Sequence, residues 1–72
     1  MAKDEFLQKI NKIIARLPEE ERADIIRDLE EHFYFGAQEG KAEKEIAAAL
    51  GSPEKMGKAL VATYRMEQLN QK

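Results

Sequence analysis

The chain has no cysteine and no tryptophan, and only one histidine and two prolines among its 72 residues. The missing cysteine excludes disulfides, thiolate metal sites and cysteine nucleophiles, and it leaves the redox compartment undetermined. No stretch approaches the roughly 18 consecutive apolar residues of a membrane-spanning helix, and the N-terminal MAKDEFLQKINK lacks the apolar core of a signal peptide. The sequence as given therefore predicts a soluble chain, compatible with a cytosolic location.

The length predicts one small helical domain, residues 1–72, that buries too little apolar surface for a deep catalytic cleft. We therefore do not expect an enzyme. The net charge of −2 is unevenly spread: it is +2 over residues 1–17, −6 over residues 18–40 and +2 over residues 41–72. The acidic middle disfavours nucleic acid and an anionic membrane surface, because both are bound mainly through Lys and Arg.

Helical periodicity of apolar residues predicts two long helices in the first half of the chain. The first covers residues 4–16, with Asp4 suited to its N-cap or to the positive end of the helix dipole, and with Pro18 ending it. The second follows Pro18 with three glutamates at the positive end of the helix dipole, and it runs to about Glu39, where Gly40 supplies a left-handed cap. The expected core residues are Phe6, Leu7, Ile10, Ile13, Ile14 and Leu17 in the first helix, and Ile25, Ile26, Leu29, Phe33 and Ala37 in the second.

Two more helices are predicted in the second half, a short one over residues 42–50 and a longer one with Ser52 as N-cap that continues to Leu69 or beyond. Gly36 lies in the apolar stripe of the second helix, so a neighbouring helix could approach closely there. The fold class is all-α, a small four-helix bundle-like domain with three longer helices and one short helix. The expected core residues are Ile46 and Leu50 in the short helix, and Met56, Ala59, Leu60, Thr63 and Tyr64 in the last.

The stretch DLEEHFYFGAQEGK, residues 28–41, sets the only histidine among acids. Asp28 and His32 are four residues apart on a helix and could converge on one ion, but no second histidine completes a zinc set. We therefore expect no metal and no cofactor, and we interpret the pair as a hydrogen bond or weak ion pair at the helix edge. Histidine changes charge within the physiological pH range, so a pH-sensing role for His32 is a further hypothesis.

The three consecutive aromatics that follow His32 cannot share one helix face, because each residue turns the helix by about 100°. Phe33 falls on the core stripe, Tyr34 nearly opposite it, and Phe35 on the acidic flank beside Asp28. One interpretation is that Phe35 packs under the last helix while Tyr34 lies flat on the surface. The other is that Tyr34 and Phe35, with His32 and Asp28, form a partner surface, since exposed aromatics are enriched where proteins meet.

Several short motifs follow one another in a distinctive order and spacing. They are Leu17-Pro18 before a Glu/Arg run, D-x-E-E-H-F at residues 28–33, Gly40-Lys41, Glu45-Ile46, and LGSP at residues 50–53. From Phe6 to about Tyr64 the chain resembles the HAAS domain, a helical signalling domain associated with helix-turn-helix regulators. It departs from that pattern at Leu29, where tyrosine is frequent, and at Ala42, where serine is common.

The resemblance implies a role in signalling or protein interaction without catalysis. In that family the domain is typically the cytoplasmic N-terminal part of a bacterial membrane protein, often encoded beside a PadR-type transcriptional repressor. A protein partner such as a helix-turn-helix regulator is then expected, with transmembrane helices after residue 72 and no small-molecule ligand. The alternative is a small DNA-binding or DNA-binding-accessory domain built on residues 40–60, in which cations would meet phosphates: Lys41, Lys44, Lys55 and Lys58.

Overall fold

The computed structural model describes residues 1–70, with the side chains of residues 1–69. Four helices account for most of this range: α1 (Lys3–Ile13), α2 (Glu19–Gln38), α3 (Glu43–Leu50) and α4 (Pro53–Asn70). No strand occurs among the described residues, so the prediction of an all-α domain with three longer helices and one short helix is confirmed. The molecule is elongated, with principal extents of 45 × 19 × 18 Å.

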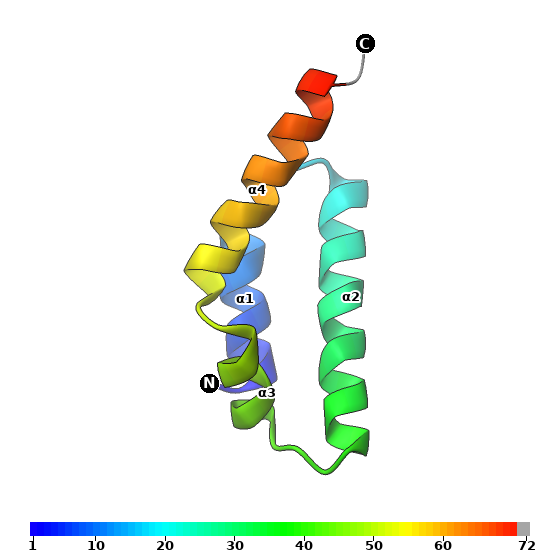
Figure 1. Ribbon diagram of the computed structural model, residues 1–72, viewed down its shortest axis with the longest axis vertical. Helices are drawn as coiled ribbons and strands as arrows, with labels where there is room; N and C mark the ends of the chain where they lie inside the picture. Colours follow the sequence, from blue (N-terminus) through cyan, green and yellow to red (C-terminus); the bar gives the residue numbers. More distant parts are fainter. Residues whose placement is uncertain (71–72) are drawn as a thin grey trace.

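Helix α1 is the centre of the arrangement, because it packs against each of the other three helices. Figure 1 shows α2 running antiparallel to α1, the short α3 closing the lower end, and α4 returning across α1. The C-terminal part of α4 extends past the end of α1 (Figure 1). One side of that projecting segment is therefore left without a neighbouring helix.

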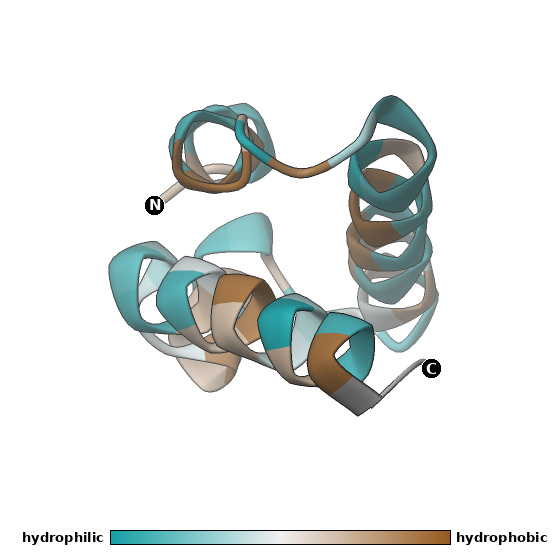
Figure 2. Cartoon of the chain, turned by 90° about the horizontal axis from the view of Figure 1, so that it is seen from above, coloured by the Kyte–Doolittle hydropathy of each residue, from teal (hydrophilic) through white to brown (hydrophobic). Residues whose placement is uncertain are grey.

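The core lies where α1, α2 and α3 meet, and it contains no buried polar or charged side chain among the described residues. The Phe6 and Phe33 rings pack edge to face with centroids 5.9 Å apart, which joins α1 to α2. Figure 2 shows apolar ribbon on α1 and α2 turned toward the space between the helices. The buried set is Phe6, Ile10, Ile14, Leu17, Leu29, Phe33, Ile46 and Ala47. Partly buried apolar residues pack against this set, among them Leu7, Ile25, Ile26, Leu50, Met56, Leu60 and Tyr64, so most of the predicted stripes are confirmed.

Gly36 lets α3 approach α2 closely, as its position in the stripe predicts. A Cβ added there would lie 2.6 Å from Cδ1 and 2.7 Å from Cγ1 of Ile46, too near for any larger residue without a shift. Ala37, which we expected in the core, is exposed. The buried line of α2 continues from Phe33 through Gly36, because Ile46 occupies the space that the glycine leaves.

The core face of α4 agrees with the predicted stripe only in part, because Met56, Leu60 and Tyr64 pack against the core as predicted but two other members do not. Ala59 and Thr63 are exposed, whereas Gly57 is buried and Val61 half-buried. A Cβ on Gly57 would lie 2.5 Å from Cγ2 of Ile13, so the bare backbone of α4 rests on α1 at this point. This contact turns the Gly57–Val61 side of the helix inward and the Ala59–Thr63 side outward.

Both ends of α1 differ from the prediction. The N-cap is Ala2, and Asp4 lies in the first turn, at the positive end of the helix dipole, which was the other predicted role. The backbone N–H of Lys3 donates to Oε1 of Glu43 at 3.0 Å. A carboxylate from α3 therefore takes the place of a local cap. The helix ends at Ile13, because the chain then tightens into a turn in which the N–H of Leu17 donates to the Ile14 carbonyl at 2.9 Å.

The other helix ends follow the predicted chemistry. Gly40 has φ 85°, and the N–H of Lys41 donates to the Gly36 carbonyl at 3.0 Å, which is the longer bond of a Schellman cap. Oγ of Ser52 accepts the N–H of Lys55 at 3.3 Å and so caps α4.

Candidate protein-interaction surface

Tyr34 and Phe35 form an exposed aromatic pair on α2. Their side chains are 60% and 61% exposed, and their rings stack edge to face with centroids 5.4 Å apart. The prediction that Tyr34 lies on the surface is confirmed. The prediction that Phe35 packs under the last helix is wrong, because α4 packs along α1 and leaves this side of α2 uncovered. We call His32, Tyr34 and Phe35 the aromatic patch.

Leaving two aromatic rings in water is costly relative to burying them. Full burial of one such ring is worth about 1.5–3 kcal/mol, and the mutual contact of the pair recovers only part of it, about 0.5–1.5 kcal/mol. The core is formed by other residues, and neither ring belongs to it. Exposed rings of this kind are characteristic of surfaces that meet another protein.

His32 and Phe35 line one shallow hollow between the end of α2 and α3. The hollow has a volume of about 160 Å³, enough for one or two side chains, and its floor includes Gly36 and Ile46. At its rim Nζ of Lys41 lies 3.3 Å from Oε1 of Glu39. Tyr34 does not line this hollow, although its ring contacts that of Phe35.

Asp28 and His32 do not interact directly in the structure. Both are exposed, and no hydrogen bond or ion pair connects them among the residues that the structure describes, so the expected helix-edge pair is wrong. Within the same residues no three His, Asp or Glu side chains gather as metal ligands. Asp28 therefore belongs to the acidic border of the aromatic patch and is not linked directly to the histidine.

The aromatic patch lies on the most acidic element of the molecule. The region from Pro18 to Gly40 has a net charge of −6. Among the described residues its carboxylates form two ion pairs, Asp24 with Arg27 at 2.9 Å and Glu39 with Lys41 at 3.3 Å, so most of them have no cationic partner. The exposed acids of α2 include Glu19, Glu20, Glu21, Asp24, Asp28, Glu30 and Glu31. A partner at this surface would meet two apolar rings beside carboxylates.

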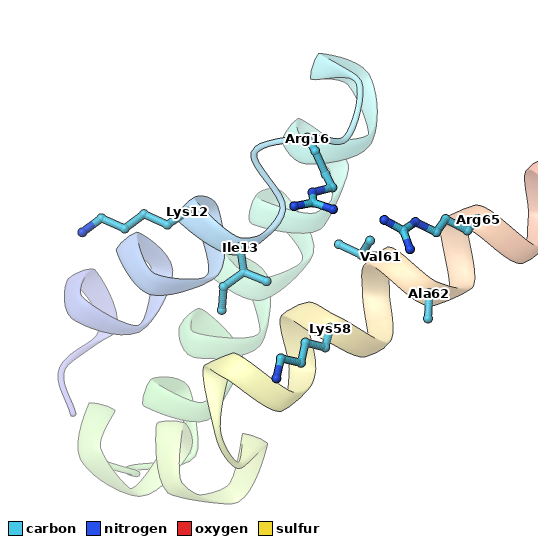
Figure 3. Close-up of a pocket in the computed structure, with 7 residues that line it drawn as sticks. All are labelled: Lys12, Ile13, Arg16, Lys58, Val61, Ala62 and Arg65. Atoms are coloured by element: carbon cyan, nitrogen blue, oxygen red, sulfur yellow. The ribbon is translucent and has the colours of Figure 1, made fainter.

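A second surface, which the sequence analysis missed, lies between α1 and α4. It is a groove of about 490 Å³ (Figure 3) with cations around an apolar floor. Its lining residues are Lys12, Ile13, Arg16, Lys58, Val61, Ala62 and Arg65, and we call it the basic groove. The only signal for it in the sequence was the net charge of +2 in each of two segments, residues 1–17 and residues 41–72. Folding brings cations from these two segments together in the groove between α1 and α4.

Within residues 1–70, none of the helices combines the length and the low polarity needed to cross a bilayer.

The fold and its exposed surfaces define a small all-α domain with an apolar core and its charged groups at the surface. Comparison with known families assigns this domain: the HAAS model matches residues 5–59. The chain belongs to the HAAS family, which supports a small signalling or interaction domain. Two further comparisons, with curated proteins and with solved structures, found no match.

Proposed function

We propose that the chain is a non-enzymatic signalling domain that binds a protein partner, and that this partner is a PadR-type transcriptional regulator. In the full-length protein the domain would lie at the cytoplasmic face of a bacterial membrane, ahead of transmembrane helices. Membership of the HAAS family supports the signalling role. The small size supports the absence of catalysis, because so short a chain builds no deep cleft.

The observation that carries the proposal is the stacked, exposed pair of Tyr34 and Phe35. Aromatic residues are enriched at protein interfaces, where they bury large areas with little loss of side-chain freedom. Tyr34 also carries a hydroxyl that could hydrogen-bond with a partner at the edge of such a contact.

The charge of α2 suits a regulator of this kind. A helix-turn-helix protein carries cations that meet DNA phosphates, and the carboxylates around the aromatic patch are complementary to such cations. Electrostatic complementarity of this type accelerates association and selects partners. Binding through α2 would therefore compete with DNA for the regulator.

The test is calorimetric titration of the 72-residue chain into the purified PadR-type regulator encoded beside it. The parent chain should bind saturably, and the double variant Tyr34→Ser, Phe35→Ser should lose at least about tenfold in affinity, because interface aromatics are frequent hot spots. Met66→Ser is the matched control, since Met66 is an equally exposed apolar side chain on α4. No heat with the parent chain, or equal loss with the control, would reject the proposal.

The alternative, a DNA-binding or accessory domain, would use cations of α3 and the start of α4. Lys41 is already paired with Glu39, whereas Lys44 and Lys55 are exposed. A salt-dependent mobility shift of duplex DNA that disappears in Lys55→Glu would favour this alternative. The proposed interaction role predicts no such shift.

A further inference from the structure

The basic groove gathers cations from two helices that are distant in the sequence. Lys12 and Arg16 come from the end of α1 and the turn after it, and Lys58 and Arg65 come from α4. Among the described side chains none of the four has a carboxylate within ion-pair distance; the ion pairs of the molecule involve other cations, namely Lys9, Arg27 and Lys41. The positive charge of this face is therefore not compensated by ion pairs among the described residues.

The floor between the cations is apolar. Ile13 and Val61 are only half-buried, and Ala62 is exposed. In Figure 3, Arg16 and Arg65 reach toward the gap between the helices from opposite sides, with Val61 between them, while Lys12 extends outward at the rim. An occupant of the groove would meet methyl groups at the centre and positive charges at the edges.

The groove continues along the projecting end of α4. Lys58, Ala62, Arg65 and Leu69 are spaced four, three and four residues apart, which places them on one face of the helix. Leu69 is 75% exposed, the most exposed of the large apolar side chains among the described residues. The line of basic and apolar side chains is thus longer than the hollow itself and suits an extended, linear occupant.

We propose that the basic groove binds an acidic amphipathic helix of a protein partner. The apolar face of that helix would rest on Ile13, Val61 and Leu69, and its flanking carboxylates would meet the surrounding Lys and Arg side chains. This is the helix-in-groove mode, in which apolar anchors recur every three or four residues. The inference rests on the proposed interaction role but uses a different face from the aromatic patch, so each can be tested without the other.

The shape and polarity of the groove favour a helix over the other anionic occupants. A lipid surface is broad and flat, and would leave the recessed Ile13 and Val61 without contact. A nucleic acid duplex would satisfy the cations through its phosphates, yet it presents no apolar ridge for the floor. A helix with one apolar and one acidic face satisfies both parts of the groove at once.

The probe is a fluorescent synthetic helix of about 18 residues, long enough to be helical in water. It carries leucines spaced four, three and four residues apart, with glutamates beside them; a matched peptide carries lysines in place of the glutamates. Fluorescence anisotropy with the 72-residue chain should show saturable binding of the glutamate peptide that weakens as salt rises. The lysine peptide should not bind.

Charge reversal in the groove supplies the decisive variant. Lys58→Glu with Arg65→Glu should weaken the glutamate peptide by at least about tenfold and create binding of the lysine peptide, because like charges across an interface are strongly unfavourable. Lys55→Glu makes one such charge reversal on α4 outside the groove and should leave the binding of both peptides unchanged; each of Lys58→Glu and Arg65→Glu alone is its matched counterpart inside the groove. Circular dichroism checks that each variant keeps its helical fold. The variant Lys58→Gln with Arg65→Gln removes the two positive charges without reversing them.

Three outcomes would overturn the proposal: no binding of the glutamate peptide to the parent chain, equal binding of both peptides, or equal loss of binding in Lys55→Glu.

A second experiment tests whether the groove binds lipid instead, with vesicles that contain about one-third phosphatidylglycerol. If they bind through Lys58 and Arg65 while the peptide does not, the groove is a lipid site and the proposal is wrong. Failure here leaves the regulator titration with the Tyr34 and Phe35 variants unaffected, so the two proposals can fail separately.

Discussion

Gly57 of α4 packs directly against Ile13 of α1. A Cβ on Gly57 would lie 2.5 Å from Cγ2 and 2.8 Å from Cβ of Ile13, so the bare backbone of one helix touches a branched side chain of the other. Ile13 also lines the basic groove. The same glycine therefore sets how closely the helices pack and where the groove floor lies.

Gly57→Ala should destabilise the domain, although alanine favours a helix over glycine by about 1 kcal/mol. The new methyl group would meet the Cβ of Ile13, which is attached directly to the backbone of α1 and cannot rotate away. Overpacking of this kind costs about 1–3 kcal/mol. The free energy of unfolding in urea should therefore fall.

Gly36→Ala is the matched comparison for this prediction. The atoms nearest to its new Cβ are Cδ1 and Cγ1 of Ile46, which can move by a rotamer change, so the loss of stability should be smaller than at Gly57.

A double-mutant cycle with Ile13→Ala isolates the contact between Gly57 and Ile13, since the Gly57→Ala penalty should shrink in that background. Equal penalties in both backgrounds would mean that Ile13 is not the obstacle.

Ala42→Ser should stabilise the domain by about 0.5–1 kcal/mol. Oε1 of Glu45 already accepts the N–H of Ala42 at 3.2 Å, which is the return bond of a capping box. Alanine has no side-chain acceptor, and a serine hydroxyl would complete the box by accepting the N–H of Glu45. An unchanged or lower denaturation midpoint would count against this start of α3. The control is Ala48→Ser, which lies in the same helix but away from its N-cap and should not stabilise the domain.

Glu43→Ala should lower the stability by about 1 kcal/mol, the usual value of a helix cap. The carboxylate of Glu43 accepts the N–H of Lys3 and also lies in the first turn of α3, where a negative charge is favourable. Glu43→Gln keeps an acceptor without the charge and should lose less. Thermal unfolding of the two variants in parallel measures the difference, and equal midpoints for parent and Glu43→Ala would contradict the contact.

Glu54 should titrate below its ordinary value. Its own backbone N–H at the start of α4 and the Ser52 hydroxyl, which donates to Oε1 at 2.9 Å, lower the pKa of Glu54 from 4.5. Because the folded pKa lies below the unfolded one, the stabilisation is present above about pH 4.5 and is lost as the pH falls through the folded value. An NMR titration of the Glu54 side-chain carboxyl measures its pKa. Ser52→Ala should raise the pKa of Glu54, and an unchanged pKa in that variant would show that the Ser52 hydroxyl is not a cause of the shift.

The helices could be predicted from the sequence because their signals are local. Apolar residues recur with helical spacing in α1, Gly40 and Ser52 mark helix ends by their own chemistry, and Gly36 interrupts an otherwise apolar stripe. Each of these features depends on residues within a few positions of one another. Most of the core followed from them.

The contacts between helices could not be predicted in the same way. A helical projection places Phe35 on a flank of α2, but it does not say whether another helix covers that flank. Gly57 has no apolar side chain, so hydrophobic periodicity overlooks it, although it is the point at which α4 rests on Ile13. The cap of α1 is formed by Glu43, 40 residues away from Lys3.

The two candidate surfaces show the same limit of linear reasoning. Tyr34 and Phe35 stood out because aromatic residues in sequence are visible without a structure. The basic groove did not, because its cations come from Lys12 and Arg16 at one end of the chain and from Lys58 and Arg65 at the other. Summing charge along the sequence showed an acidic middle, whereas the fold separates an acidic α2 from the basic groove.

The most direct test of the account is an NMR titration of the isotope-labelled chain with the PadR-type regulator that we propose as its partner. We predict saturable shifts of the backbone amides of His32, Tyr34 and Phe35 at the partner surface, which should be lost in the Tyr34→Ser, Phe35→Ser variant while the spectrum remains that of a folded domain. A regulator that leaves these three amides unperturbed at saturation, or that shifts none of the spectrum, would contradict the assignment of this surface.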